Sequence, residues 1–276
     1  MELLRLKHQT LDLTRPQVMG ILNVTDDSFS DGGLYLDQDS AKHQAEQMIS
    51  AGATIIDVGG ESTRPGAASV SGQQELDRVM PIIEWLAPEV DVSIDTNKAI
   101  VMRSAVHAGA AMINDVCALT QEGALVAAAE VDVPICLMHM QGTPRTMQAE
   151  PRYTDVIDDI KAFFSTRIKA CDKAGIKTNR IILDPGFGFG KDLQHNVELL
   201  RRLSEFKQFG LPVLAGLSRK SMIGAVIDKP PHERVAASVA LAVLAWQQGA
   251  SFIRVHDVVE TVDALSMVHF VENFGE

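Results

Sequence analysis

The sequence has few cysteines, few aromatic residues and no long hydrophobic run. Its 276 residues include 3 cysteines, none of them in a C-x-x-C pair, so neither a disulfide framework nor a zinc ribbon is expected. We therefore expect Cys117, Cys136 and Cys171 to be free, buried thiols of a cytoplasmic protein. Since 46% of the residues are hydrophobic but only 5% aromatic, the core must be built mainly from aliphatic side chains.

The charge and the hydrophobic runs exclude two classes of partner. A formal net charge of −11 disfavours binding to nucleic acid or to an anionic membrane, because both reward a basic face. The first ten residues lack the apolar core of a secretion signal, and the longest nearly apolar stretch, residues 236–246, is too short to span a bilayer. We expect a soluble protein that has no nucleic-acid partner and no membrane partner.

Eight short apolar runs rich in Val and Ile are the main positive feature of the sequence. Each ends near a polar residue and is followed by a helix-like stretch, a pattern typical of strands in a parallel sheet. The runs are 18–23, 54–57, 92–95, 112–115, 135–139, 181–184, 213–218 and 252–256. Eight strand–helix units predict the α/β class and a (β/α)8 TIM barrel, in which the carboxyl ends of the strands form the active site.

The remaining segments predict one domain over residues 1–276. Residues 1–16 alternate apolar and polar side chains before Pro16, which predicts a short N-terminal β-hairpin at the bottom of the barrel. Many of the expected helices end near a glycine, which favours a left-handed C-cap. The expected helices are 39–51, 73–87, 98–109, 122–130, 154–174, 193–208, 232–249 and 258–272, and the cap glycines are Gly52, Gly109, Gly175, Gly210 and Gly249.

Polar residues at the strand ends indicate a binding site. Asp95, Asn114 and Asp184 end three of the runs, and their carboxylate and amide groups suit the N–H and carbonyl edge of a flat heterocycle. A single Asp in such a place is as often a helix cap. Three together favour a ligand.

Two basic segments follow the last two runs. Residues 216–221 contain Arg219 and Lys220, and residues 254–256 contain Arg254 and His256; the corresponding loops of TIM barrels often bind phosphate. For Arg219 itself, a surface ion pair is the expected role. Residues 186–191 have the glycines and the lysine of a phosphate loop but the wrong spacing for a Walker motif, so the glycines predict a sharp turn and a close approach of backbone to ligand instead.

Two long polar loops, residues 25–33 and 59–66, follow the first two runs. Loops of this length at the catalytic face of a barrel commonly close over a substrate. Residues 27–38 echo a calcium-binding loop, but Phe29 and Gln38 stand where ligands are needed, which excludes an EF-hand. No histidine cluster has the spacing of a zinc site.

Eight ordered motifs resemble the dihydropteroate synthase family. They span residues 18 to about 260, and the one departure is Ala149-Glu150, where many relatives carry Asn-Pro. The motifs are residues 20–33, 59–66, 93–96, 113–115, 137–142, 183–191, 218–220 and 253–256. The resemblance implies a transferase that condenses 6-hydroxymethyl-7,8-dihydropterin pyrophosphate with p-aminobenzoate, giving 7,8-dihydropteroate and pyrophosphate in folate biosynthesis.

The resemblance also implies a set of site residues, a Mg²⁺ ion held through Asn23, inhibition by sulfonamides and a homodimer. Lys220, Arg254 and His256 would be catalytic. The pterin would contact Asp95, Asn114, Asp184, Lys220 and Arg254. The pyrophosphate would contact Asn23, Arg64, Arg254 and His256. The p-aminobenzoate would contact Thr63, Arg64, Pro65, Phe189 and Ser221.

Three other functions remain open from the residues alone. A pterin-dependent methyltransferase module shares the barrel and its Asp and Asn strand ends, but it has no use for the basic Ser218-Arg219-Lys220 segment. A Schiff-base aldolase would use Lys220 as its nucleophile. A non-catalytic pterin-binding scaffold would bind the ligand without turnover.

Overall fold

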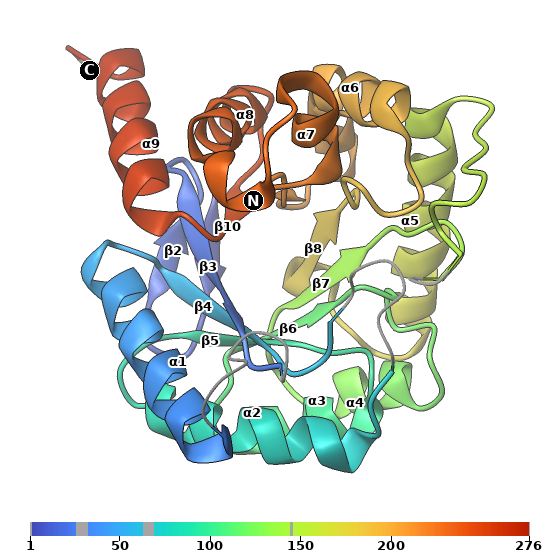
Figure 1. The fold of residues 1–276 in the computed structure, drawn as a ribbon. Coiled ribbons are helices and arrows are strands. Elements are labelled where there is room, and N and C mark those ends of the chain that lie inside the picture. The colour runs from blue at the N-terminus through green and yellow to red at the C-terminus, as the bar shows by residue number, and fades with distance from the viewer. Residues whose placement is uncertain (1, 26–32, 63–68, 144–145, 276) are drawn as a thin grey trace.

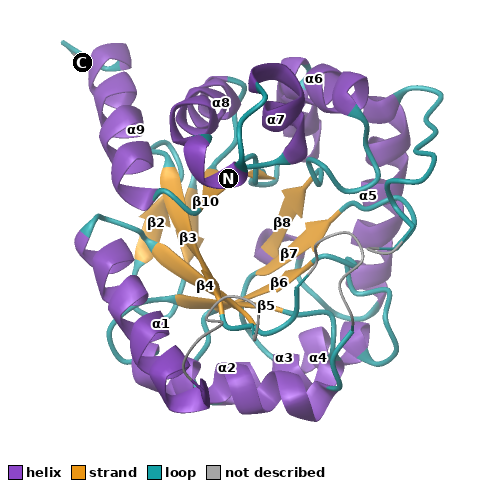
Figure 2. Cartoon of the chain, viewed as in Figure 1, coloured by secondary structure: helices purple, strands orange, loops and turns teal. Residues whose placement is uncertain are grey.

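The computed structural model describes residues 2–25, 33–62, 69–143 and 146–275. In these residues, eight parallel strands form a ring with helices around its outside (Figure 1), which confirms the predicted (β/α)8 barrel. Figure 2 shows the strands at the centre and the helices as an outer layer. The barrel strands are β3 Gln17–Asn23, β4 Ile55–Gly59, β5 Val92–Asp95, β6 Met112–Asp115, β7 Ile135–Met138, β8 Ile181–Asp184, β9 Leu214–Ala215 and β10 Phe252–Val255.

The strand order places the first and last strands of the barrel side by side. The sheet runs β8-β7-β6-β5-β4-β3-β10-β9, so β10 pairs with β3 across almost the whole sequence. An isolated parallel bridge between Leu183 and Val213 joins β8 to the segment before β9 and completes the ring. All of the strands are parallel, so their carboxyl ends lie at one mouth.

The helices cover the barrel in chain order, and their starts are set by local caps. In α2, Ser71 and Gln74 form a reciprocal capping box, while Asp155 caps α5 and Asp192 caps α6. The helices are α1 Gly33–Ser50, α2 Gly72–Leu86, α3 Ala99–His107, α4 Ala124–Glu130, α5 Val156–Lys173, α6 Leu193–Arg201, α7 Ser221–Ile227, α8 Val235–Gln247 and α9 Val258–Glu272, with 3₁₀ turns η2 Thr178–Arg180, η3 Leu203–Phe209 and η4 Pro231–Glu233.

The structure differs from the predicted helices in two places. The helix expected over residues 193–208 is broken at Arg202, whose φ of −110° lies outside the helical range, and it continues only as the 3₁₀ turn η3. The short helix α7 was not predicted, because seven residues give too little periodicity to recognise. Its buried Met222 and Ile223 anchor it to the barrel. The five predicted cap glycines all have positive φ, as expected.

Two clusters of buried side chains make up the core. The larger one lies between the strands and the helices. The smaller one fills the lower interior of the barrel, where leucines of the hairpin β1 Leu3–Arg5 and β2 Thr10–Asp12 meet Met19, Ile55 and Phe252. The predicted hairpin is therefore confirmed, and it closes the end of the barrel opposite the carboxyl ends of the strands. None of the described helices is long and apolar enough to cross a membrane.

Candidate active site

Arg254 is the centre of a charged cluster at the mouth of the barrel. Its Nε donates to Oδ2 of Asp57 at 2.6 Å, and its Nη2 donates to Oδ2 of Asp95 at 2.8 Å. Asn114 also donates to Oδ2 of Asp57, over 3.0 Å. The cluster thus joins β10, β4, β5 and β6 and brings together the predicted site residues Arg254, Asp95 and Asn114. Asp57, which bonds both Arg254 and Asn114, is fully buried.

Burial and charge act in opposite directions in this cluster. Burial raises the pKa of Asp95 to about 7, although the guanidinium of Arg254 opposes the shift. Burial likewise disfavours the charged form of Arg254, but the carboxylates of Asp57 and Asp95 outweigh it and raise the pKa of the guanidinium. Oδ1 of Asp95 makes no hydrogen bond to any described residue, so it can accept one from a ligand.

Asp184 and Lys220 form a second group at the mouth. Oδ1 of Asp184 accepts a hydrogen bond from the Gly186 amide at 2.7 Å. Burial raises the pKa of Asp184, and the charge of Lys220 is the main opposing influence. Burial lowers the pKa of Lys220 to about 8. Nζ of Lys220 donates to the Phe187 carbonyl and lies 4.6 Å from the centre of the Phe189 ring.

His256 is held by the buried hydroxyl of Ser218. This hydroxyl accepts the backbone N–H of His256 at 3.2 Å and lies 3.0 Å from its Nδ1. The hydroxyl has one hydrogen and two lone pairs, so beside this amide it pairs with Nδ1 either as the donor or as a second acceptor. Arg219 pairs with Asp257 through both Nε and Nη2, which confirms the predicted ion pair. Its guanidinium therefore binds the turn after β10 rather than a ligand.

Asn23 ends β3 next to the Arg254 cluster. A Cβ atom placed on Gly59 of the neighbouring strand would lie 3.7 Å from Oδ1 of Asn23 and 3.7 Å from Oδ2 of Asp95. No group of three or more His, Cys, Asp or Glu side chains in the described residues is arranged to hold a metal. Mg²⁺ usually takes only one or two protein oxygens and completes its shell with water and phosphate. A single amide oxygen therefore fits an ion that is carried by a pyrophosphate.

Several predicted residues of the p-aminobenzoate site lie outside the described part of the chain. These are Thr63, Arg64 and Pro65, together with Phe29 of the first long loop. Ser221 is exposed at the start of α7. The ammonium of Lys220 lies 4.6 Å from the centre of the Phe189 ring, and Ser221 is the next residue in the chain after Lys220.

Sequence reasoning missed four polar residues near the site. Asp57 and Asp115 were noted only as strand ends; Asp57 orients Arg254 and Asn114, while Asp115 accepts the amides of the turn after β6 at residues 117 and 119. Lys191 and His139 bond to each other within the β7 and β8 loops. The strand-end positions of Asp57, Asp115 and His139 and the glycine-rich segment before Lys191 were the available signals. Only the closed barrel reveals which carboxylate faces which cation.

A cavity of about 600 Å³ opens at the mouth beside these groups. Residues that follow β5, β6 and β7 line it, among them Lys98, Val116 and Met138. The ammonium of Lys98 is paired with Glu61 and Glu75, so it is neutralised. The cavity therefore adds space beside the charged cluster without adding free positive charge.

Comparison with known proteins gives consistent matches. The family of pterin binding enzymes matches residues 19–256. Dihydropteroate synthase of Escherichia coli K12 is 56% identical over 261 residues, which cover 94% of this chain and 93% of the relative. A Yersinia pestis dihydropteroate synthase solved with a sulfonamide drug is 56% identical, with a TM-score of 0.94 and coverage of 98% and 99% of the two chains. The Xanthomonas albilineans enzyme in complex with 7,8-dihydropteroate is 46% identical, with a TM-score of 0.88 and coverage of 96% and 97%.

Proposed function

The chain belongs to the dihydropteroate synthase family of pterin-binding enzymes, and from that premise we propose how its residues carry out the reaction. Members of the family condense 6-hydroxymethyl-7,8-dihydropterin pyrophosphate with p-aminobenzoate to give 7,8-dihydropteroate and pyrophosphate. The observation that carries the assignment is the set of donors and acceptors at the mouth, in which the buried Asn114 and Asp184 and the part-buried Asp95 lie with two cations.

The pterin is read by the ends of β5, β6 and β8. Asp184 accepts N–H bonds from the pterin edge, and Oδ1 of Asp95 and the amide of Asn114 bind its other polar atoms. Asp57 and Asp95 fix the guanidinium of Arg254 through two hydrogen bonds, so that it can stack on the ring face. Lys220 donates a hydrogen bond to the carbonyl oxygen on this edge of the pterin ring. Fixed groups of this kind orient the substrate before reaction.

The pyrophosphate binds where β3 and β10 end. Nε2–H of His256 donates to a phosphoryl oxygen, since Ser218 occupies Nδ1, and Arg254 and Arg64 supply positive charge. Asn23 would hold the Mg²⁺ that accompanies the pyrophosphate, and the ion would supply positive charge that offsets the negative charge of the leaving group.

The reaction needs stabilisation of departing charge more than proton transfer. Electron release from the reduced pterin ring expels pyrophosphate, and the arylamine then attacks the resulting cationic methylene carbon and loses its proton. Arg254, His256 and Lys220 stabilise the developing anion from fixed positions. Thr63, Arg64 and Pro65 lie outside the described residues; their proposed role is to help exclude water, which would otherwise capture the cation.

Phe189 and Ser221 form the described part of the p-aminobenzoate site. The ring of Phe189 lies against Lys220, and the Ser221 hydroxyl at the start of α7 suits the carboxylate of the arylamine. Sulfonamides, which mimic a flat aryl amine with an anionic tail, compete for the same place.

The assignment is tested by incubating purified protein with both substrates and Mg²⁺. We expect equal amounts of pyrophosphate and dihydropteroate, competition between sulfonamide and p-aminobenzoate, and loss of both products in EDTA. A pterin-dependent methyltransferase module or a binding scaffold would release no pyrophosphate. Turnover that continues unchanged in EDTA would contradict the role of Asn23 in holding a metal.

We also propose that the protein is a cytoplasmic homodimer. Free Cys117, Cys136 and Cys171 suit a reducing compartment, and both substrates are small polar molecules. Exposed apolar side chains on α8 and α9, including Leu244, Met267 and Phe270, supply a surface for a second copy. Sedimentation of the purified protein tests the dimer, because a monomer at micromolar concentration would exclude it.

A further inference from the structure

The segment Gly186–Lys191 has the composition of a phosphate loop, but its lysine is buried. Lys191 is 2% exposed, and its Nζ lies 2.9 Å from the Gly186 carbonyl oxygen and 3.1 Å from that of Phe189. The third neighbour is Nδ1 of His139 at 3.1 Å. No carboxylate of a described residue forms a salt bridge with it. A head group enclosed by its own loop cannot bind a phosphate.

The glycines of this loop allow it to fold tightly around the lysine. Gly186, Gly188 and Gly190 all have positive φ, between +65° and +82°, which side-chain-bearing residues rarely adopt. A Cβ on Gly186 would lie 1.9 Å from the carbonyl oxygen of His139, and one on Gly190 would lie 2.5 Å from that of Gln141. The backbone of the loop is therefore packed directly against the backbone of the segment after β7.

The polar groups of the loop are satisfied by different partners. Besides the two carbonyls bonded to Lys191, the Gly188 amide donates to Oδ1 of Asn196 at 2.7 Å and the Gly190 carbonyl accepts from the Tyr153 hydroxyl at 2.8 Å. The Phe187 carbonyl accepts from Lys220. The carbonyls of the adjacent residues Gly186 and Phe187 thus accept from two different lysines. Lys191 donates from the core, and Lys220 donates from the side of the substrate site.

We infer that Lys191 is a positioning residue for catalysis: its two hydrogen bonds fix the β8–α6 loop so that the Phe187 carbonyl and the Phe189 ring hold Lys220 in place. The inference rests on the proposed function, which assigns Lys220 and Phe189 to the two substrates. Two N–H donors are sufficient, and both an ammonium and a neutral amine provide them. His139 is neutral in either case, because burial and the nearby lysine lower its pKa to about 2.

Removal of the amine takes from the part-buried Phe189 carbonyl its donor on Lys191 and leaves the buried Gly186 carbonyl with only the Phe189 amide as donor. The loop can compensate for this loss by moving. A displacement of about 1 Å at a catalytic group can lower a rate by about a hundredfold. In Lys191→Met we therefore expect kcat/KM to fall by about tenfold or more, with weaker pterin binding and a higher KM for p-aminobenzoate. Lys191→Gln keeps two N–H donors on a shorter chain, so it is expected to be intermediate.

The matched control is Lys161→Met, which removes an ammonium from an ion pair with Glu205 on the outside of the barrel. Its melting temperature should fall while its kinetics stay at the wild-type level. Amide hydrogen exchange gives a readout that does not depend on turnover: residues 186–190 should exchange faster in K191M than in the wild type or K161M, and calorimetry should show weaker binding of a pterin lacking pyrophosphate.

Two results would overturn the inference. One is wild-type exchange of residues 186–190 together with wild-type kinetics in K191M. The other is faster exchange of the loop with kcat and both KM values unchanged, which would make Lys191 structural only. If K191M does not fold, K191Q carries the same comparison. Failure of the proposed function is recognised separately, because the wild-type protein would then form no dihydropteroate.

Discussion

Asp184 both supports a turn and faces the proposed pterin site, and substitutions can separate these roles. Asp184→Ala removes the acceptor of the Gly186 amide and the acceptor for the pterin N–H groups. Charge-assisted hydrogen bonds are each worth roughly 1.5–3 kcal/mol net. A loss of about 3 kcal/mol corresponds to about a hundredfold weaker pterin binding, which calorimetric titration measures.

Asp184→Asn is the control for the turn. Its Oδ1 still accepts the Gly186 amide, but its NH₂ group is placed where the pterin also donates, so we expect near wild-type stability with intermediate affinity. Thermal melts run beside the titrations distinguish the two roles. A lower melting temperature in D184A with unchanged pterin affinity would leave the turn as the residue's only function.

Ser218 gives a second prediction at the scale of one residue. Ser218→Ala removes the group that bonds both the backbone and Nδ1 of His256, so the imidazole loses its fixed orientation. We expect kcat/KM to fall by about tenfold and inorganic pyrophosphate to inhibit less well, with binding of a pterin lacking pyrophosphate unchanged. Ser218→Thr keeps the hydroxyl and should recover much of the activity. Equal loss of affinity for both ligands would argue against a specific effect on His256.

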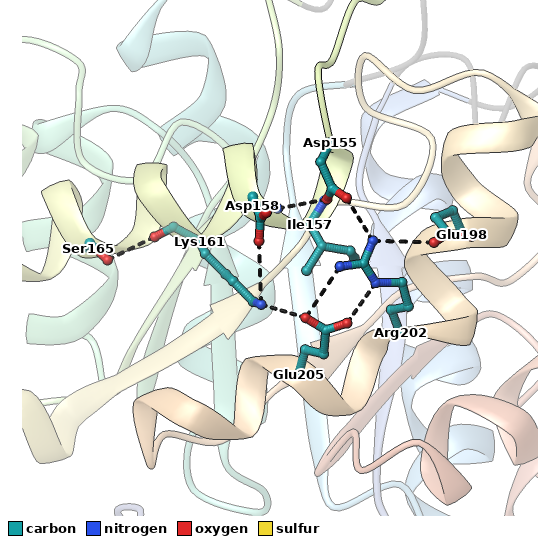
Figure 3. A network of polar contacts seen from close by, with 8 residues as sticks. All are labelled: Asp155, Ile157, Asp158, Lys161, Ser165, Glu198, Arg202 and Glu205. Atoms are coloured by element: carbon teal, nitrogen blue, oxygen red, sulfur yellow. Dashed lines mark hydrogen bonds and ion pairs between the residues drawn. The ribbon is translucent and has the colours of Figure 1, made fainter.

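At the scale of elements, an ion-pair network joins α5 to the segment after α6 (Figure 3). Arg202 donates to Glu205 at 2.6 Å and to the α5 cap Asp155 at 2.8 Å, and Lys161 donates to Glu205 at 2.5 Å. The hydrogen bonds from Arg202 and Lys161 lower the pKa of Glu205 to about 2. The network therefore ties a helix start to the 3₁₀ turn that replaces the end of the expected helix.

The lowered pKa of Glu205 predicts a pH-dependent contribution to stability. The carboxylate is favoured in the folded state, so its contribution is present above its ordinary pKa of 4.5 and is lost as the pH falls toward about 2. In urea unfolding, Glu205→Gln should be less stable than the wild type at pH 7, and the difference should shrink below about pH 4.5. Glu89→Gln is the control, because Glu89 is exposed and its side chain forms no hydrogen bond or ion pair with a described residue. A difference that is constant with pH would contradict the assignment.

At the scale of the whole molecule, the hairpin end of the barrel contributes stability and the opposite end contributes chemistry. Leu11 of β2 is 3% exposed in the lower core cluster. Leu11→Ala should cost about 2–5 kcal/mol of unfolding free energy, as large-to-small core substitutions do, with kcat and KM unchanged in the folded protein.

The same variant tests whether residues 1–276 behave as one cooperative unit, as we propose. Pairing of β10 with β3 ties the end of the chain to its beginning, so loss of packing under the barrel should shift a single transition rather than create a second one. Calorimetry and circular dichroism should report the same midpoint. Two separated transitions in L11A would show that the hairpin unfolds independently.

The sequence by itself determined the elements and most of the site's chemical groups. Short apolar runs rich in Val and Ile, each followed by a helix-like stretch, are typical of strands buried on both faces. All eight strands were therefore predictable, as were the cap glycines with positive φ. Helix α7 and the break at Arg202 were not, because short helices and local dihedral changes leave little periodic signal. Asp95, Asn114, Asp184 and Lys220 were predictable from their places after the strands.

The partners of these groups were decided only by the tertiary structure. Asp57 and Arg254 stand far apart in the sequence, yet closure of the barrel brings them to 2.6 Å, and no local pattern states which strand ends will face each other. Lys191 is the clearest case. The spacing of its motif excluded a Walker loop and predicted a sharp turn, but it assigned no role to the lysine. The fold encloses the amine of Lys191, which donates to the carbonyls of Gly186 and Phe189 within a loop whose glycines have positive φ.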